Sequence, residues 1–174
     1  MSIPAAYKMN HVALSVPPAE IQGPGREELL TFFGDVFGWS EYRENEQFVK
    51  QFAVELSALV GREVPPYEPL VMLTGSGQFV FLYGLDDAMR STPVDHWGFE
   101  VESEAELDAI LERAKKIAAH DHQVQIVDKA ISSYDIDDEE LRERLPSSRV
   151  DLINCYIRYR LPLAVELQYY RWAQ

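Results

Sequence analysis

The chain contains an internal repeat, and this repeat is the feature that most limits how it can fold. The segment Asn-His-Val-Ala-Leu-Ser-Val at 10–16 returns as Asp-His-Trp-Gly-Phe-Glu-Val at 95–101, so His96 follows His11 by 85 positions. Phe81 and Glu166, near the ends of the two halves, have the same separation. A shared separation at both boundaries indicates two copies of one structural module.

Hydrophobic periodicity predicts the same order of elements in each half: strand, helix, strand, extra helix, strand, strand. In the first half we expect strands at 10–16, 39–43, 70–74 and 78–83 and helices at 26–37 and 46–62. In the second half we expect strands at 95–101, 124–127, 151–161 and 164–170, a helix that begins after Ser103, and a short charged helix at 137–145. The predicted fold class is α+β, with two tandem βαβββ modules at about 8–90 and 94–174 in a single domain.

Composition excludes some classes of protein. The formal net charge of −13 argues against a nucleic-acid partner, which would be met by clustered Lys and Arg. No apolar run approaches the roughly 18 residues of a membrane span, and the first residues do not resemble a secretory signal. Cys155 is the single cysteine, so we expect no internal disulfide and a cytoplasmic location.

Alternation along the strands selects the candidate site residues. In a strand, residues two apart share a face. Val12, Leu14 and Val16 are expected to face a helix, which turns His11 to the other side. The same parity turns His96 and Glu166 away from the core side of their strands.

Two imidazoles and a carboxylate form a ligand set for a divalent metal with open coordination positions. Fe(II) is the favoured ion, with Mn(II), Zn(II) or Ni(II) as alternatives. At this point the ordinary interpretation stays open, in which each histidine is a hydrogen-bonded strand residue and Glu166 faces solvent.

Four segments carry a resemblance to a known superfamily: HVALSV, REELLTFFGDVFGW, DHWGFEVESEAELDAI and VELQYY. They resemble the vicinal oxygen chelate superfamily, which includes glyoxalase I, extradiol dioxygenases, fosfomycin-resistance enzymes and bleomycin-resistance proteins. The resemblance implies a cup-shaped mixed β-sheet flanked by helices. It also implies four ligand positions, at His11, Phe81, His96 and Glu166. Because Phe81 cannot bind a metal, His11, His96 and Glu166 remain as a 2-His-1-carboxylate triad.

This triad is similar to that of the extradiol dioxygenases. The resemblance makes Tyr156 the residue that hydrogen-bonds the substrate oxygen. Arg158, on the same strand face, is expected to receive an anionic group of a small aromatic or oxygenated substrate. Two features depart from the extradiol pattern. The acid–base histidine of those enzymes has no counterpart here, since the remaining His120 and His122 are expected at a helix end, and the turn before Glu166 lacks Asp-Pro-Asp-Gly.

Other functions remain open. Phe79, Phe81 and Tyr83 share one face of their strand and could form an aromatic wall for a planar ligand. This wall also suits a non-catalytic drug- or small-molecule-binding protein of the bleomycin-resistance type. A glyoxalase- or epimerase-type isomerase or lyase is less favoured because the fourth ligand is missing. A fosfomycin-type transferase is less favoured because a basic cluster is lacking. The resemblance also implies a homodimer.

Overall fold

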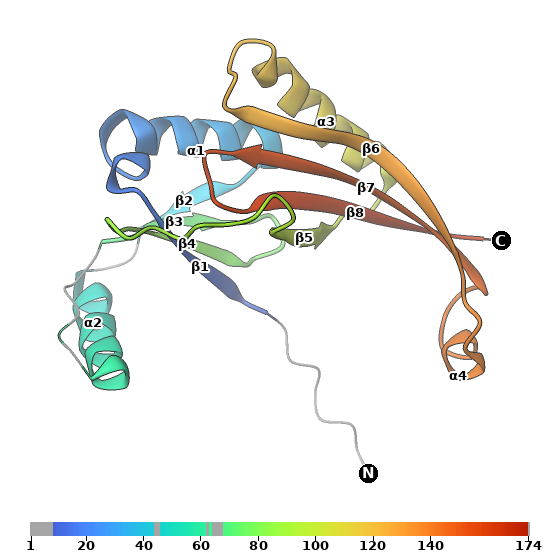
Figure 1. Cartoon of the computed structure of the whole chain (residues 1–174), viewed down its shortest axis with the longest axis horizontal. Coiled ribbons are helices and arrows are strands. Elements are labelled where there is room, and N and C mark those ends of the chain that lie inside the picture. Colours follow the sequence, from blue (N-terminus) through green and yellow to red (C-terminus); the bar gives the residue numbers. More distant parts are fainter. Residues whose placement is uncertain (1–8, 44–45, 62, 64–67, 174) are drawn as a thin grey trace. The chain divides into compact units, whose positions relative to one another are not determined.

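The computed structural model describes residues 9–43, 46–61, 63 and 68–173. The chain divides into two compact units, residues 1–90 and 91–174, and each is described by itself (Figure 1).

The first unit contains one four-stranded mixed sheet. Its elements are β1 (His11–Val16), a 3-10 turn (Pro18–Glu20), α1 (Gly23–Phe37), β2 (Ser40–Tyr42), α2 (Glu46–Val60), β3 (Leu70–Leu73) and β4 (Phe79–Gly84). The strand order is β1-β4-β3-β2. The β1–β4 pair is parallel and the other two pairs are antiparallel. Gly77, with a φ of 80°, lies in the turn between β3 and β4.

Helix α1 supplies the core of the first unit. It buries Leu29, Phe33 and Val36, while alternate residues of the strands, among them Leu14 and Leu82, are also buried. This burial is the largest favourable contribution to the stability of the unit. The predicted parity of β1 is confirmed, because Leu14 and Val16 are buried and His11 is exposed.

The second unit repeats the architecture with longer strands. Its elements are β5 (His96–Glu100), α3 (Glu104–Ala118), β6 (Val124–Asp135), α4 (Glu139–Arg142), β7 (Arg149–Tyr159) and β8 (Ala164–Trp172). The order is β5-β8-β7-β6, again with a parallel first pair and antiparallel remaining pairs.

Helix α3 begins after Ser103, as predicted, and its first turn forms a capping box. The Ser103 hydroxyl accepts a hydrogen bond from the Glu106 backbone N–H at 3.1 Å, and the Glu106 carboxylate accepts one from the Glu102 N–H at 3.0 Å. The helix buries Leu107, Ile110, Leu111 and Ala114. Ile153, Cys155, Ile157, Val165 and Leu167 of β7 and β8 are buried too. Every second residue of these strands therefore belongs to the core, and the residues between them are left for the opposite face.

The register of the two sheets repeats with the separation found in the sequence. His11 pairs with Phe79 in the first unit, and His96 pairs with Ala164 in the second. Ala13 pairs with Phe81, and Gly98 pairs with Glu166. The α+β class and the two βαβββ modules are therefore confirmed. The joining of both sheets into one cup stays a prediction.

The second unit differs from the prediction at two elements. Strand β6 extends to Asp135, eight residues past the expected end, and its register with β7 shifts between Val127 and Ala130. Such a bulge interrupts strict alternation, which is why periodicity alone predicted too short a strand. Helix α4 covers four residues, less than the nine expected at 137–145.

In the described ranges, no helix combines the length and the apolar character needed to cross a bilayer.

Candidate metal and ligand site

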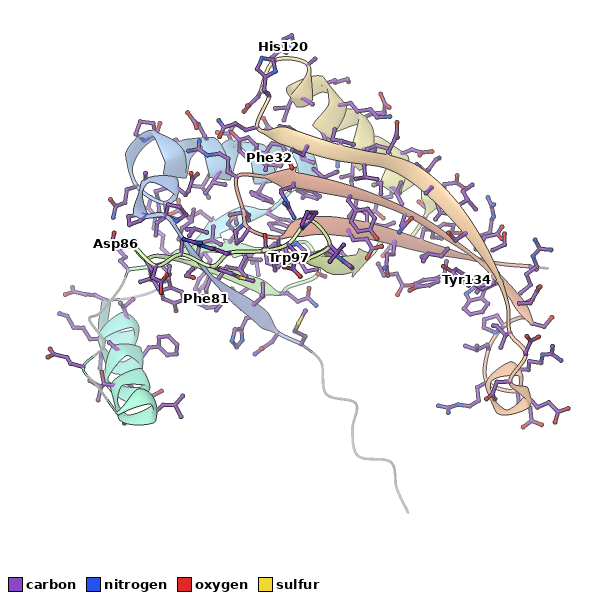
Figure 2. All side chains as sticks on the ribbon, in the orientation of Figure 1. Phe32, Phe81, Asp86, Trp97, His120 and Tyr134 are labelled. Atoms are coloured by element: carbon purple, nitrogen blue, oxygen red, sulfur yellow. The ribbon has the colours of Figure 1, made fainter. Side chains whose placement is uncertain are left out.

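His96 is held so that one ring nitrogen is available to a ligand. It is an exposed residue of β5 and directly precedes the buried Trp97, which Figure 2 labels. Its Nδ1 lies 2.8 Å from the backbone carbonyl of Val94. Because a carbonyl only accepts, Nδ1 carries the proton, and in the neutral ring Nε2 presents a lone pair. This is the arrangement usual for metal-binding histidines.

Glu166 is the buried acid of the second unit. Glu166 is 3% exposed, although it lies on the face of the sheet opposite α3. Its Oε1 accepts from Asn154 Nδ2 at 2.7 Å and its Oε2 from Gln168 Nε2 at 2.7 Å. The solvent-facing interpretation of Glu166 is therefore wrong. A buried carboxylate with neutral donors around it is costly unless a cation is close.

The spacing of these two side chains fits a shared cation. Nε2 of His96 lies 3.0 Å from Oε2 of Glu166. Two donor atoms bound at about 2.1 Å, at right angles around one first-row ion, are roughly 3.0 Å apart. A proton on Nε2 would suit the same distance, since an imidazolium and a carboxylate form a hydrogen-bonded pair. The donor set thus fits a divalent ion.

Tyr156 lies beside both candidate ligands. It pairs directly with Glu166 across β7 and β8, and its ring makes an edge contact with His96, with centroids 5.3 Å apart. A hydrogen bond to the Glu166 carboxylate, together with burial, raises the pKa of the Tyr156 phenol to about 12. Tyr156 therefore stays neutral near pH 7 and can donate a hydrogen bond.

Arg158 lies two residues further along the same face of β7. Its Nη2 is 3.4 Å from the carbonyl oxygen of Thr92, a long hydrogen bond that leaves other guanidinium N–H groups available to an anion.

The first unit carries the predicted aromatic wall. Phe79, Phe81 and Tyr83 follow one another along β4 with ring centroids 6.2 and 6.5 Å apart, and the Phe81 and Tyr83 rings are stacked. Figure 2 labels Phe81 on this strand. The wall continues beyond these residues, to Tyr42 of β2 at 5.2 Å from Phe79 and to Phe52 of α2 at 6.4 Å from Tyr83. We call these five residues the aromatic ladder.

His11 borders the aromatic ladder. Its ring makes an edge contact with Phe81 at 5.6 Å. Its Nδ1 lies 2.7 Å from Asn10 Oδ1, so Nε2 is again the nitrogen left with a lone pair. The two histidines therefore have the same tautomer and equivalent strand positions.

The structure brings the candidates together in two groups. His96, Glu166 and Tyr156 are neighbours in the second unit, and His11 lies with Phe79, Phe81 and Tyr83 in the first. In the described part of the chain, no third His, Cys, Asp or Glu completes a metal-binding group. The third ligand predicted from the sequence, His11, belongs to the first unit, and its part in such a group stays a prediction.

Sequence reasoning missed two residues of the site, Asn154 and Gln168, as partners of Glu166. Strand parity was the signal that could have found them, because Asn154 lies two residues before Tyr156 and Gln168 two after Glu166. Their contact also depends on the β7–β8 register, in which they are direct partners.

Two tandem βαβββ units with matching register define the class of fold. The chain has the fold of the vicinal oxygen chelate superfamily, and comparison with solved structures supports this. A glyoxalase family protein from Bacillus anthracis superposes with a TM-score of 0.57 at 14% identity, over 98% of this chain and 100% of that one. The fosfomycin resistance protein FosX from Listeria monocytogenes gives 0.53 at 14% identity, over 95% and 94%.

Another form of that Listeria protein was solved as a complex with Mn(II) and a dihydroxypropylphosphonic acid. It superposes with a TM-score of 0.50 at 15% identity, over 94% of this chain and 92% of that one. At these identities the likeness concerns the fold. No family model matches the sequence. No curated protein matches it either.

Proposed function

We propose that this chain binds one divalent metal ion through His11, His96 and Glu166 and acts on a small aromatic or oxygenated substrate, in the manner of a dioxygenase. The observation that carries the proposal is the 3.0 Å separation of His96 Nε2 and Glu166 Oε2, with Nδ1 of His96 held by a carbonyl. Fe(II) is the favoured ion. The Mn(II) complex of the structurally similar Listeria protein supports Mn(II) as an alternative.

Such an ion, when bound, supplies positive charge to stabilise an oxygen anion on the substrate. The chain's own residues bind and orient that substrate. Tyr156 keeps its proton near pH 7 and donates a hydrogen bond to a substrate oxygen. Arg158 attracts an anionic group, and the aromatic ladder stacks against a planar ring.

Metal content tests this proposal most simply. Protein prepared without chelator and loaded with Fe(II) or Mn(II) is expected to hold about one ion per chain, measured by elemental analysis after desalting. His11→Ala, His96→Ala and Glu166→Ala should each lose the ion. The control is His120→Ala, which removes a histidine from the turn after α3, labelled in Figure 2, and should leave the content unchanged. Wild-type protein that retains no ion contradicts the proposal.

Turnover is tested separately from metal content. Oxygen uptake with a panel of catechols is expected only in the Fe(II)-loaded wild type. An isomerase or lyase activity on thiol adducts or acyl thioesters would replace the dioxygenase proposal with the glyoxalase-type one.

The aromatic ladder favours a second candidate, a binding protein that needs no metal. In that case a planar aromatic probe such as 1-naphthol would bind the chelator-treated protein with one-to-one stoichiometry. Phe81→Ala would weaken that binding about tenfold or more, whereas His96→Ala would leave it unchanged. Binding that needs added metal and is lost in His96→Ala would instead favour the metal-dependent function.

A further inference from the structure

A chain of hydrogen bonds extends from Glu166 along the face of the second sheet opposite α3. The Gln168 amide nitrogen donates to Glu166 Oε2 at 2.7 Å. The Tyr170 hydroxyl lies 3.1 Å from the other end of that amide, Gln168 Oε1. Because a carboxylate only accepts, the amide nitrogen must face Glu166, and Tyr170 donates to the amide oxygen. Tyr170 therefore holds Gln168 in the one orientation that serves Glu166.

Asn154 holds the other carboxylate oxygen. Its Nδ2 donates to Glu166 Oε1 at 2.7 Å and approaches the Tyr156 hydroxyl oxygen at 3.3 Å. Both protons of this amide are therefore directed to acceptors. The Tyr156 oxygen accepts from Asn154, and its own proton remains available for Glu166 or a substrate.

Counting acceptor sites shows what this arrangement does to Glu166. A carboxylate has about four lone-pair positions. Asn154 and Gln168 occupy two of them, one on each oxygen. A second position on Oε2 is on the side of His96, whose Nε2 is 3.0 Å from Oε2. The two amide donors thus hold the carboxylate with Oε2 directed toward His96.

We propose that Tyr170, Gln168 and Asn154 are positioning residues that orient the Glu166 carboxylate toward His96 and thereby set the affinity of the site for a divalent cation. This inference rests on the proposed function, since it assigns these residues to the same metal site. Glu166 then loses little conformational entropy when the metal binds, because its carboxylate is already fixed in the metal-free protein.

The effect of each residue on metal affinity follows from its position in this chain of hydrogen bonds. Gln168→Leu removes one donor and frees Oε2 to turn away, so Mn(II) affinity should fall about 10- to 100-fold. Tyr170→Phe removes only the hydroxyl that orients the amide, and the loss should be smaller, about threefold to tenfold. Tyr169→Phe is the control, because it removes a hydroxyl from the adjacent residue, which faces the other side of β8.

The experiment measures Mn(II) affinity by calorimetry and urea unfolding with chelator present. Tyr170→Phe and Gln168→Leu are expected to weaken Mn(II) binding and to broaden the EPR spectrum of the bound ion. Tyr170→Phe should leave metal-free stability within about 1 kcal/mol. A purely structural role would change stability without changing the spectrum, and that result would overturn the inference.

Two further outcomes separate this inference from the proposed function. Wild-type protein that binds no Mn(II) overturns the proposed function and with it the role of these residues in metal affinity. If wild-type protein binds Mn(II) and both Tyr170→Phe and Gln168→Leu bind it with the same affinity, this inference is overturned and the proposed function is not. NMR of the side-chain amide of Gln168 in metal-free protein provides a second measurement. Its protons should exchange slowly in wild type and faster in Tyr170→Phe, and equal rates would contradict the positioning.

Discussion

At the scale of single residues, the two candidate ligands of the second unit differ sharply in how they are held. Glu166 is 3% exposed and accepts hydrogen bonds from Asn154 and Gln168. The His96 side chain is 39% exposed. The stability lost when a side chain is removed depends on the buried polar groups that lose their hydrogen-bond partner. Substitution of these two ligands is therefore expected to change the stability of the metal-free protein by different amounts.

Glu166→Ala should therefore destabilise the metal-free protein by about 1–3 kcal/mol, because it leaves two partly buried amide donors without their acceptor. His96→Ala should change stability by less than about 1 kcal/mol, although both variants are expected to lose the metal. Urea unfolding in the presence of chelator measures the difference. Equal effects on stability would mean that the hydrogen bonds of Glu166 do not stabilise the fold.

Tyr156 allows a prediction about pH. Its pKa is raised to about 12 by the hydrogen bond to Glu166 and by burial, compared with about 10 for an unfolded tyrosine. Its contribution to stability is thus fully present below about pH 10 and is lost as the pH rises toward 12. The absorbance at 295 nm is titrated for metal-free wild type and for metal-free Tyr156→Phe. The difference between the two curves should have its midpoint near pH 12. A midpoint near 10 would show that the phenol does not bond Glu166.

The candidate metal ligands could be predicted from the sequence, but the residues that hydrogen-bond to them could not. His11, His96 and Glu166 stand out because imidazoles and an acid recur at equivalent strand positions. Asn154 and Gln168 could not be selected in the same way, because amides are common on polar strand faces. Only the pairing of β7 with β8 brings these two amides to the same carboxylate.

At the scale of elements, helix α1 ends where the sequence predicts, and the reason is conformational. Gly38 has a φ of 72°, and its N–H donates to the carbonyl of Gly34. A glycine is favoured after a helix because other residues are strained in the left-handed region. Gly34 lies inside the same helix, and an added Cβ there would meet the Trp39 carbonyl oxygen at an ordinary 3.5 Å.

These two glycines should respond to alanine in opposite directions. Gly38→Ala is expected to destabilise the protein by about 1 kcal/mol, because alanine is strained at positive φ. Gly34→Ala is expected to stabilise it by about 0.5–1 kcal/mol, because alanine favours a helix interior. Thermal and urea unfolding of both variants test the pair, and destabilisation of similar size in both would contradict this account of the helix end.

Strand β6 shows what periodicity alone could not predict. Its first residues, Val124–Val127, match the expected strand, but Asp128 and Lys129 interrupt the alternation at the bulge. Lys129 bonds Glu104 and Asp108 of α3, so the bulged residue links strand and helix. The later part, through Asp135, is held by pairing with β7 rather than by an apolar face of its own.

At the scale of the whole molecule, the two units repeat one architecture but differ in the chemistry of equivalent faces. Phe81 occupies the position in the first unit that Glu166 occupies in the second, and Tyr83 occupies that of Gln168. One copy therefore presents aromatic rings where the other presents a hydrogen-bonded acid. The two copies therefore differ in side-chain chemistry at positions that the register makes equivalent.

The central claim is that His11 of the first unit binds the same ion as His96 and Glu166. Pulsed EPR of Cu(II)-loaded protein tests it most directly, because the echo modulation counts the imidazoles bound to the ion. Cu(II) is bound more tightly than Fe(II) or Mn(II) by the same ligands, so variants that lose those two ions are expected to retain Cu(II). We predict two imidazoles in wild type and in His120→Ala, and one in His11→Ala and in His96→Ala. A single imidazole in wild type, or two that persist in His11→Ala, would contradict the claim.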